Sequence, residues 1–258
     1  MKFIMKREKT DHSLEVDIHV HTIASGHGLS TLSEIRKIAT KRKIRIVGIA
    51  DHGPSMRGAS HLEYFTMGDD VRRASSPCCK FLFGCEANIQ SQNGDIDIPP
   101  SIIQELDYLL AGIHNLTPYT QNSDFSRHYH TDALINCIKN VKPTAITHPI
   151  YPLFPIDVAA VVTAAATSEV VLEINARVLR RANEDIICEY QKLIECAAKC
   201  QCYLMLSSDS HFVDDVGDVT PLKKLEVSIK AHKELIINYS VDSFNAFWGK
   251  HQIQDIRI

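Results

Sequence analysis

A regular alternation of apolar strand patterns with helical patterns runs along this 258-residue chain and constrains its fold more than any other feature. Short apolar runs bounded by turn residues predict strands, and longer segments with helical periodicity predict helices. Strands and helices that alternate at this spacing indicate parallel βαβ units with right-handed connections. The predicted strands cover residues 15–21, 44–50, 80–86, 107–114, 144–148, 170–175 and 202–207.

The segments between these strands supply the predicted helices. Thr31 and Glu34 form a capping box, which is typical of a helix start. The pair Asn93-Gly94 predicts a hairpin turn after the third strand. The predicted helices cover residues 31–43, 60–75, 128–140, 156–168, 183–199, 221–233 and 241–250.

Seven strand–helix units in a chain of this length predict one domain over residues 1–258. The expected fold is α/β, a distorted seven-stranded (β/α)7 barrel of the TIM type. An open, doubly wound sheet is the alternative. No glycine-rich phosphate loop follows the first strand, and its absence favours the barrel.

Charge and composition argue against several classes of partner. A formal net charge of -3 and a pI near 6.5 do not fit a protein that coats nucleic acid. No stretch approaches the roughly 18 apolar residues of a membrane span, and the first residues are too charged for a signal peptide. Eight cysteines without paired CxxC spacing are expected to be reduced thiols. We therefore expect a cytoplasmic protein that needs neither membrane nor nucleic acid.

Side chains that bind metals follow the predicted strands. Asp17-Ile-His19-Val-His21 ends the first strand, and alternation along a strand would place these three polar residues on one face. Asp17 is thereby a candidate to orient a ligand imidazole. In barrels the active site lies on the rim formed by the carboxyl ends of the strands. The candidate ligands at that rim are His19, His21, His27, His52, Glu86, His114, His148, Asp209 and His211.

Nine candidate ligands are too many for one cation, since a catalytic zinc takes about three and keeps one position open. The number fits a cluster of two or three metals. Imidazole-dominated sites suit zinc, iron, manganese or nickel better than calcium or magnesium. A carboxylate can span two cations, so Glu86 is the expected bridging ligand.

Four motifs together resemble the polymerase and histidinol phosphatase (PHP) family, closest to its single-domain YcdX-like phosphatase subgroup. The motifs are Asp17-Ile-His19-Val-His21-Thr22, Ala50-Asp51-His52-Gly53, Thr147-His148-Pro149 and Ser208-Asp209-Ser210-His211. The subgroup likeness includes Gly84-Cys85-Glu86-Ala87-Asn88-Ile89 and Leu172-Glu173-Ile174-Asn175. This resemblance implies a seven-stranded barrel with three divalent transition metals, zinc first and manganese or iron as alternatives.

The resemblance also implies how the ligands are divided and which reaction they serve. One metal would be held by His19, His21, Glu86 and Asp209, a second by His27, His52 and His211, and a third by Glu86, His114 and His148. The implied reaction is hydrolysis of a small phosphomonoester by a metal-activated hydroxide.

Candidates outside the ligand set are weaker. Arg177, Arg180 and Arg181 follow the sixth strand, where a guanidinium could hold a phosphate oxygen with two hydrogen bonds. Beside the carboxylates Glu86 and Asp209, the catalytic candidate is a rim histidine that protonates the leaving group. His61 is the first choice, with His128 and His130 as alternatives.

Two other functions remain open at this point. Amidohydrolase-type C–N or C–O hydrolases also carry HxH after the first barrel strand, but a carboxylated lysine usually bridges their metals. No lysine stands at the relevant strand ends here. A nuclease or polymerase-associated PHP module is the other alternative, which the absence of a basic stripe disfavours.

Overall fold

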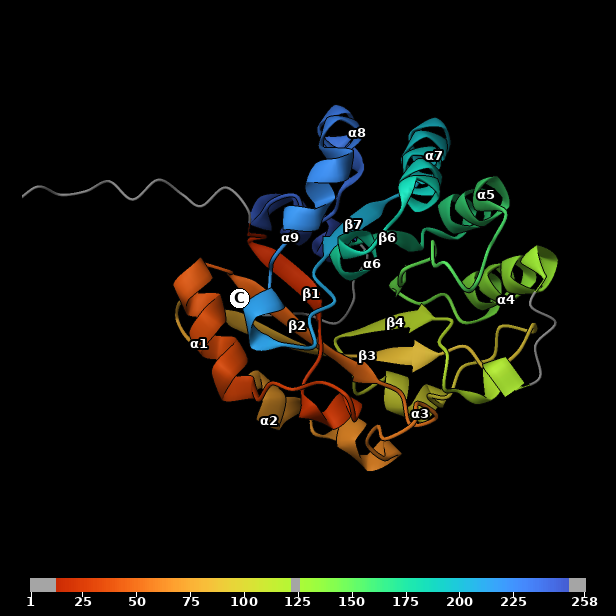
Figure 1. The fold of residues 1–258 in the computed structure, drawn as a ribbon. Helices are drawn as coiled ribbons and strands as arrows, with labels where there is room; N and C mark the ends of the chain where they lie inside the picture. Colours follow the sequence, from red (N-terminus) through yellow and green to blue (C-terminus); the bar gives the residue numbers. More distant parts are fainter. Residues whose placement is uncertain (1–12, 122–125, 251–258) are drawn as a thin grey trace, which may run out of the picture.

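Seven parallel strands form one sheet in sequential order, and the sheet curls into a nearly closed barrel (Figure 1). The computed structural model describes residues 13–121 and 126–250. The order of the seven parallel strands confirms the predicted (β/α)7 barrel. The strands are β1 (Val16–Val20), β2 (Ile46–His52), β3 (Lys80–Asn88), β4 (Tyr108–Gly112), β5 (Ala145–Ile146), β6 (Val171–Asn175) and β7 (Leu204–Ser207).

Helices surround the sheet, and they connect each strand to the next (Figure 1). No helix of the described residues is long and apolar enough to cross a membrane. The α-helices are α1 (Leu32–Arg42), α2 (Gly68–Arg72), α3 (Pro100–Ile103), α4 (Arg127–Asn140), α5 (Val158–Ser168), α6 (Ala176–Arg180), α7 (Glu184–Cys200), α8 (Glu226–Ala231) and α9 (Val241–Lys250). Short 3-10 turns are η1 (Ile23–Ser25), η2 (Leu62–Thr66), η3 (Pro118–Gln121), η4 (Val213–Asp215), η5 (Thr220–Leu225) and η6 (Lys233–Leu235).

Apolar side chains fill the barrel at the end where the strands begin, and the polar residues lie at the rim where the strands end. Ile18, Leu82 and Leu110 from three strands belong to one buried cluster. Phe244 and Trp248 of α9 belong to the same cluster, so this helix covers the end at which the strands begin. The side chains that could bind metals therefore lie at the opposite, carboxyl end.

A side-chain amide completes the seam between β1 and β7. Buried Asn238 accepts a hydrogen bond from the Leu206 amide (2.9 Å) and donates to the carbonyls of Leu206 (2.6 Å) and Val16 (3.0 Å). Towards the rim, the His21 amide donates to the carbonyl of Ser210 (2.9 Å). These contacts join β7 to β1, so the barrel closes at this seam with seven strands.

Several local predictions need correction. The helix predicted over 60–75 consists of η2 and α2, and the one over 221–233 consists of η5 and α8. Neither η5 nor α8 has a side-chain N-cap hydrogen bond, unlike α1, whose predicted capping box is present. The hairpin at Gly94 holds a single antiparallel bridge, Ile89 to Ile96, and Gly94 adopts a left-handed φ of 81°.

Candidate metal centre

The nine predicted ligands converge on the rim. Atom-to-atom contacts of 3.4 Å or less link all of them into one cluster. Eight of the side chains are buried and His27 is exposed, because it comes from the loop after η1. Parallel pairing explains the convergence, since it brings the carboxyl ends of all strands to one side. Register places Glu86 directly beside His52, for example.

Glu86 lies at the centre of the cluster, and its two oxygens face different imidazoles. Oε1 lies 3.0 Å from Nε2 of His148 and 3.1 Å from Nε2 of His114. Oε2 lies 3.0 Å from Nδ1 of His52, 3.3 Å from Nε2 of His19 and 3.4 Å from Nε2 of His21. A carboxylate in this position has one oxygen available to each of two neighbouring cations.

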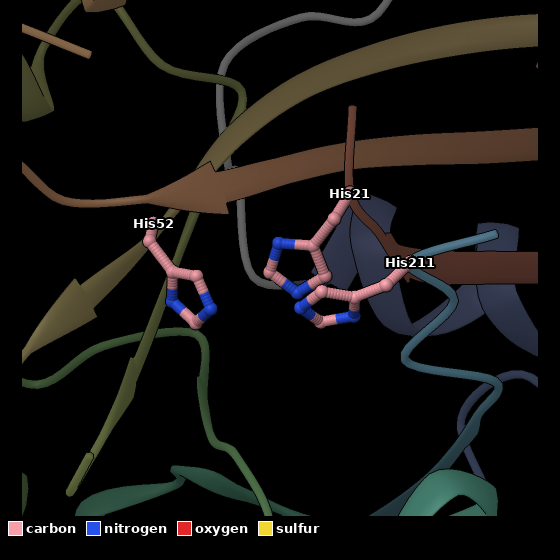
Figure 2. Close-up of side chains that lie close together, drawn as sticks. All are labelled: His21, His52 and His211. Carbon is pink, nitrogen blue, oxygen red and sulfur yellow. The ribbon is translucent and has the colours of Figure 1, made fainter. Parts of the chain in front are cut away.

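The remaining carboxylate faces the other side of the cluster. Asp209 Oδ1 lies 3.3 Å from Nε2 of His21 and 3.3 Å from Nδ1 of His211. His211 Nε2 in turn lies 2.9 Å from Nε2 of His27. Figure 2 shows ring nitrogens of His21, His52 and His211 directed toward the space between the three rings.

The donor atoms fit cations. Three groups of buried side chains each place their ligand atoms within 4.8 Å of one another. Among the described residues, Glu86 Oε2, Asp209 Oδ1, His52 Nδ1 and both ring nitrogens of His114 are buried and form no hydrogen bond of good geometry, although several of them lie close to one another. Leaving so many buried polar atoms unpaired costs roughly 1–3 kcal/mol each unless something else binds them. The three groups are His21, His52 and His211; His19, His21 and Asp209; and His52, Glu86 and His114.

Protonation states at the centre favour cation binding. Burial would raise the pKa values of Glu86 and Asp209, but neighbouring imidazoles, His19 foremost, hold both pKa values well below their usual range. Burial lowers the pKa of His52 to about 3, and it holds the pKa of His21 well below its ordinary value. At neutral pH the carboxylates are anionic and these two imidazoles have a free lone pair.

Glu173 of β6 supports two of the ligands and was missed as a site residue. Its Oε1 lies 2.5 Å from Nδ1 of His19 and accepts a hydrogen bond from the Ser207 hydroxyl (2.6 Å). Its Oε2 accepts from the backbone amide of His148 (2.6 Å) and from the Asn175 side chain (2.9 Å). A carboxylate on the second nitrogen of a ligand histidine fixes the ring and its tautomer.

The charge of Glu173 also acts on His19. Burial lowers the pKa of His19, but the carboxylates of Glu173, Glu86 and Asp209 together outweigh it, Glu173 foremost, and hold that pKa well above its ordinary value. The sequence carried a signal for this residue, because a carboxylate stands in the middle of the otherwise apolar run Val170–Ile174. A charge in a strand buried on both faces needs a partner.

Ser25 orients the His21 ring, as Glu173 orients the His19 ring. Its hydroxyl oxygen lies 2.8 Å from Nδ1 of His21, and the hydroxyl donates to Asp51 (2.6 Å). Asp51 also accepts hydrogen bonds from Thr22 (2.7 and 2.8 Å) and from the hydroxyl of Tyr64 (2.6 Å). Burial and the Asp51 charge raise the pKa of Tyr64, so it remains a donor. Tyr64 thus helps to hold Asp51, which in turn holds Ser25 beside His21.

Asp17 does not orient an imidazole as expected. A bulge between Asp17 and Val20 breaks the alternation along β1, so Asp17 and His19 have different surroundings. The Asp17 carboxylate accepts hydrogen bonds from the Ser208 hydroxyl (2.5 Å) and the Gly217 amide (2.9 Å). It holds the loop that carries Asp209.

Two candidate ligands have left-handed backbones. His148 has a φ of 28° and Asp209 a φ of 50°, a region that costs an ordinary residue free energy. Gly112 lies against the same region, because a Cβ there would come within 3.1–3.2 Å of the rings of His148 and His114. Both side chains contact the cluster from these backbones, His148 through Glu86 and Asp209 through His21.

The weaker candidates are scattered. Exposed His61 precedes η2, and no hydrogen bond or ion pair joins it to the cluster. His128 is exposed and lies 3.3 Å from Asp132. His130 is a buried residue of α4, and its Nδ1 lies 2.7 Å from the Tyr119 hydroxyl. His130 is therefore a core residue, and the prediction of a rim position for it is wrong.

The three arginines differ in their surroundings. Arg180 forms ion pairs with Asp215 (2.8 Å) and Asp218 (3.4 Å), which occupy the guanidinium. Arg177 is exposed, but its charge helps to lower the pKa of His27, after burial and His211. Arg181 ends α6 as an exposed residue. Only Arg177 shows an electrostatic effect on the cluster.

Known proteins have sequences similar to this chain. A protein from Clostridium acetobutylicum named "Probable phosphatase" is 37% identical over 225 residues, which cover 86% of this chain and 89% of the relative. A "Probable phosphatase" from Caldicellulosiruptor bescii is 36% identical over 242 residues, covering 92% and 97%.

The fold also matches a solved structure, the histidinol phosphate phosphatase of Lactococcus lactis in complex with zinc, L-histidinol and phosphate. The TM-score is 0.63 at 17% identity, and the match covers 84% of this chain and 92% of the other. This likeness supports the barrel. The family model for the PHP domain matches residues 17–200. The chain therefore belongs to the PHP domain family.

Proposed function

We propose that this chain is a phosphatase that hydrolyses small phosphomonoesters at a centre of three divalent transition-metal ions. Zinc is the first candidate metal, with manganese or iron as alternatives. The observation that carries the proposal is the position of Glu86, whose oxygens face two different sets of imidazoles. The relatives named as phosphatases support the reaction class. We further propose that residues 1–258 form a single domain.

We divide the cluster into three donor sets, two of which share Glu86. The sets we propose are His19, His21, Glu86 and Asp209; His27, His52 and His211; and Glu86, His114 and His148. His52 also lies close to Glu86 and His114, so it stands at the boundary between the second and third sets. Shared donors of this kind require the cations to be neighbours.

The residues of the chain have separate tasks in this proposal. Bound divalent cations would supply Lewis acidity and lower the pKa of coordinated water toward neutrality. Glu173 and Ser25 hold His19 and His21 in one orientation. Arg177 is the side chain we assign to a peripheral oxygen of the phosphate dianion. His61 remains the proposed acid for the leaving group, although no contact with the cluster supports it.

The two alternatives fit the chain less well. Amidohydrolases of the carboxylated-lysine type bridge their metals through a lysine, whereas Glu86 takes that position here. A nuclease would need a basic surface for the phosphate backbone, and the formal net charge is -3. Small phosphomonoesters suit the charge balance better.

The experiment combines a metal count with a substrate panel. Protein purified without chelator should contain close to three transition-metal ions per chain and should hydrolyse small phosphomonoesters, but not oligonucleotides or cyclic amides. Glu86→Gln should lose more metal and more kcat than His27→Ala, because the bridging charge couples two cations while His27 serves one. Absence of metal from the wild type, or equal mild effects of both variants, would refute the proposal.

A further inference from the structure

A cavity of about 350 Å³ lies beside the centre, outside the set of proposed ligands. One wall is the segment after β5, residues 149–156, and the opposite wall is the first part of α7. Ligand pockets in proteins have volumes of roughly 300–1,000 Å³, so this cavity is at the lower end. It therefore fits a compact group.

The wall after β5 is rigid. Pro149, Pro152 and Pro155 recur at every third position, and each fixes its own φ. Between them, the Phe154 amide donates to the Tyr151 carbonyl (3.0 Å), and the two rings are stacked with centroids 5.6 Å apart. A preformed wall avoids most of the ordering cost when a ligand binds.

Tyr151 connects this cavity to the metal centre. Its ring centroid lies 5.6 Å from that of His148, a proposed ligand. A smaller void, which shares Pro149, Tyr151, Phe154 and Ile156 with the larger cavity, reaches His148 itself. The cavity and the centre are therefore neighbours, because the Tyr151 ring that lines the cavity also lies against a proposed ligand.

The remaining lining sets the chemistry of the occupant. Ile150, Ile156 and Ile186 add apolar surface to the aromatic wall. The charged residues of the lining are one cation, Arg127, and two anions, Asp185 and Glu189. The excess of negative charge repels a second phosphate, while apolar and aromatic walls favour a ring.

We infer that this cavity binds the leaving group of the substrate, and that this group is a compact aromatic or alicyclic alcohol without a second anionic group. The inference rests on the proposed phosphatase function, and it adds the class of ester. Cys188 offers the means to test it, because it is exposed, lies on α7 and lines the cavity.

The test compares two esters that differ only in the ring. Benzyl phosphate and ethyl phosphate both release an alkoxide, so their intrinsic reactivity is similar. We expect the wild type to prefer benzyl phosphate by about tenfold or more in kcat/KM, the range for added apolar groups in a pocket. Cys188→Trp fills the cavity and should abolish this preference, because it lowers kcat/KM for benzyl phosphate far more than for ethyl phosphate. Cys200→Trp, at an exposed cysteine of the same helix outside the cavity lining, is the matched control.

A binding measurement separates this inference from the proposed function. Benzyl alcohol, followed by saturation-transfer NMR, should bind the wild type and Cys200→Trp, but not Cys188→Trp. If no ester is hydrolysed but this binding pattern holds, the phosphatase proposal falls and the cavity assignment stands. If Cys188→Trp binds benzyl alcohol like the wild type, or slows both esters equally, the cavity assignment is wrong.

A folding defect in Cys188→Trp would be recognised from its thermal unfolding. In that case treatment of the folded wild type with a bulky maleimide, which attaches to Cys188, replaces the variant; Cys188→Ala, which still reacts at exposed Cys78 and Cys200 but not at position 188, is the control. Loss of the benzyl preference in the modified wild type, and its retention in the treated Cys188→Ala protein, would support the assignment. Retention in both would overturn it.

Discussion

Replacing Glu173 by glutamine should weaken metal binding without unfolding the protein. The carboxylate has four neighbours at hydrogen-bond distance: the His19 ring, the Ser207 hydroxyl, the His148 amide and the Asn175 side chain. A glutamine keeps one acceptor oxygen and turns an NH₂ group toward the other pair of neighbours. At about 1–3 kcal/mol for each unpaired buried donor, the variant should lose roughly 2–6 kcal/mol of unfolding free energy.

The loss should extend to the metal, because Glu173 orients His19 and holds the backbone of His148. Removal of such a supporting carboxylate typically lowers metal affinity or activity by about 10–100-fold. Competition with a chromophoric chelator measures the affinity, and denaturant unfolding of the metal-free protein measures the stability. Excess metal should restore much of the activity, since all proposed ligands remain in place.

Glu195→Gln is the matched control, because Glu195 is exposed on α7, whereas Glu173 is buried against the proposed ligands. It should leave metal affinity and stability unchanged. If Glu173→Gln binds metal as tightly as the wild type, the reasoning fails: the contact with His19 would then have no part in preparing the ligand. A loss of activity that excess metal does not restore would equally assign Glu173 a different task.

Three further predictions concern other parts of the chain. Arg177→Ala should lower kcat/KM by about tenfold to hundredfold, as expected for a hydrogen bond to a charged group, while Arg181→Ala should have little effect in the same assay. Asn238→Leu should lower the unfolding free energy by roughly 2–4 kcal/mol in denaturant titration, because it leaves seam groups unpaired; an unchanged midpoint would contradict this. Burial raises the thiol pKa of Cys79 to about 11, the thiol pKa values of Cys137 and Cys202 to about 12, and that of Cys85 well above its ordinary value. At pH 8 these thiols are therefore protonated, and peptide mass spectrometry should find them alkylated only after unfolding: Cys79, Cys137, Cys202 and Cys85.

The barrel and the convergence of the nine ligands could be predicted because both depend on local patterns. Each predicted ligand except His27 lies at or just after the end of an apolar run, and parallel pairing then brings the ends of those runs together. Glu173 and Ser25 are different, because their importance lies in partners that are distant in sequence or hidden by the fold. A motif that contains Glu173 was recognised, but a pattern does not show which nitrogen a carboxylate faces.

Other differences also have physical causes. The bulge in β1 separates Asp17 from His19, and no strand pattern predicts where an extra residue enters a ladder. Arg180 is close to Arg177 in sequence and is predicted with it, but Asp215, which follows β7 in the chain, forms an ion pair with Arg180. The cavity beside Tyr151 depends on the position of α7, and sequence periodicity does not contain that information.

The seam closed by Asn238 gives the proposed metals a mechanical role. His19 and His21 stand on one side of this seam, Asp209 and His211 on the other, almost the whole barrel apart in sequence. Any cation held by both sides would act as a latch on the barrel. Opening the seam and releasing such a cation would then be one coupled equilibrium. Chelation should accordingly speed amide exchange first along β1 and β7, before the strands opposite.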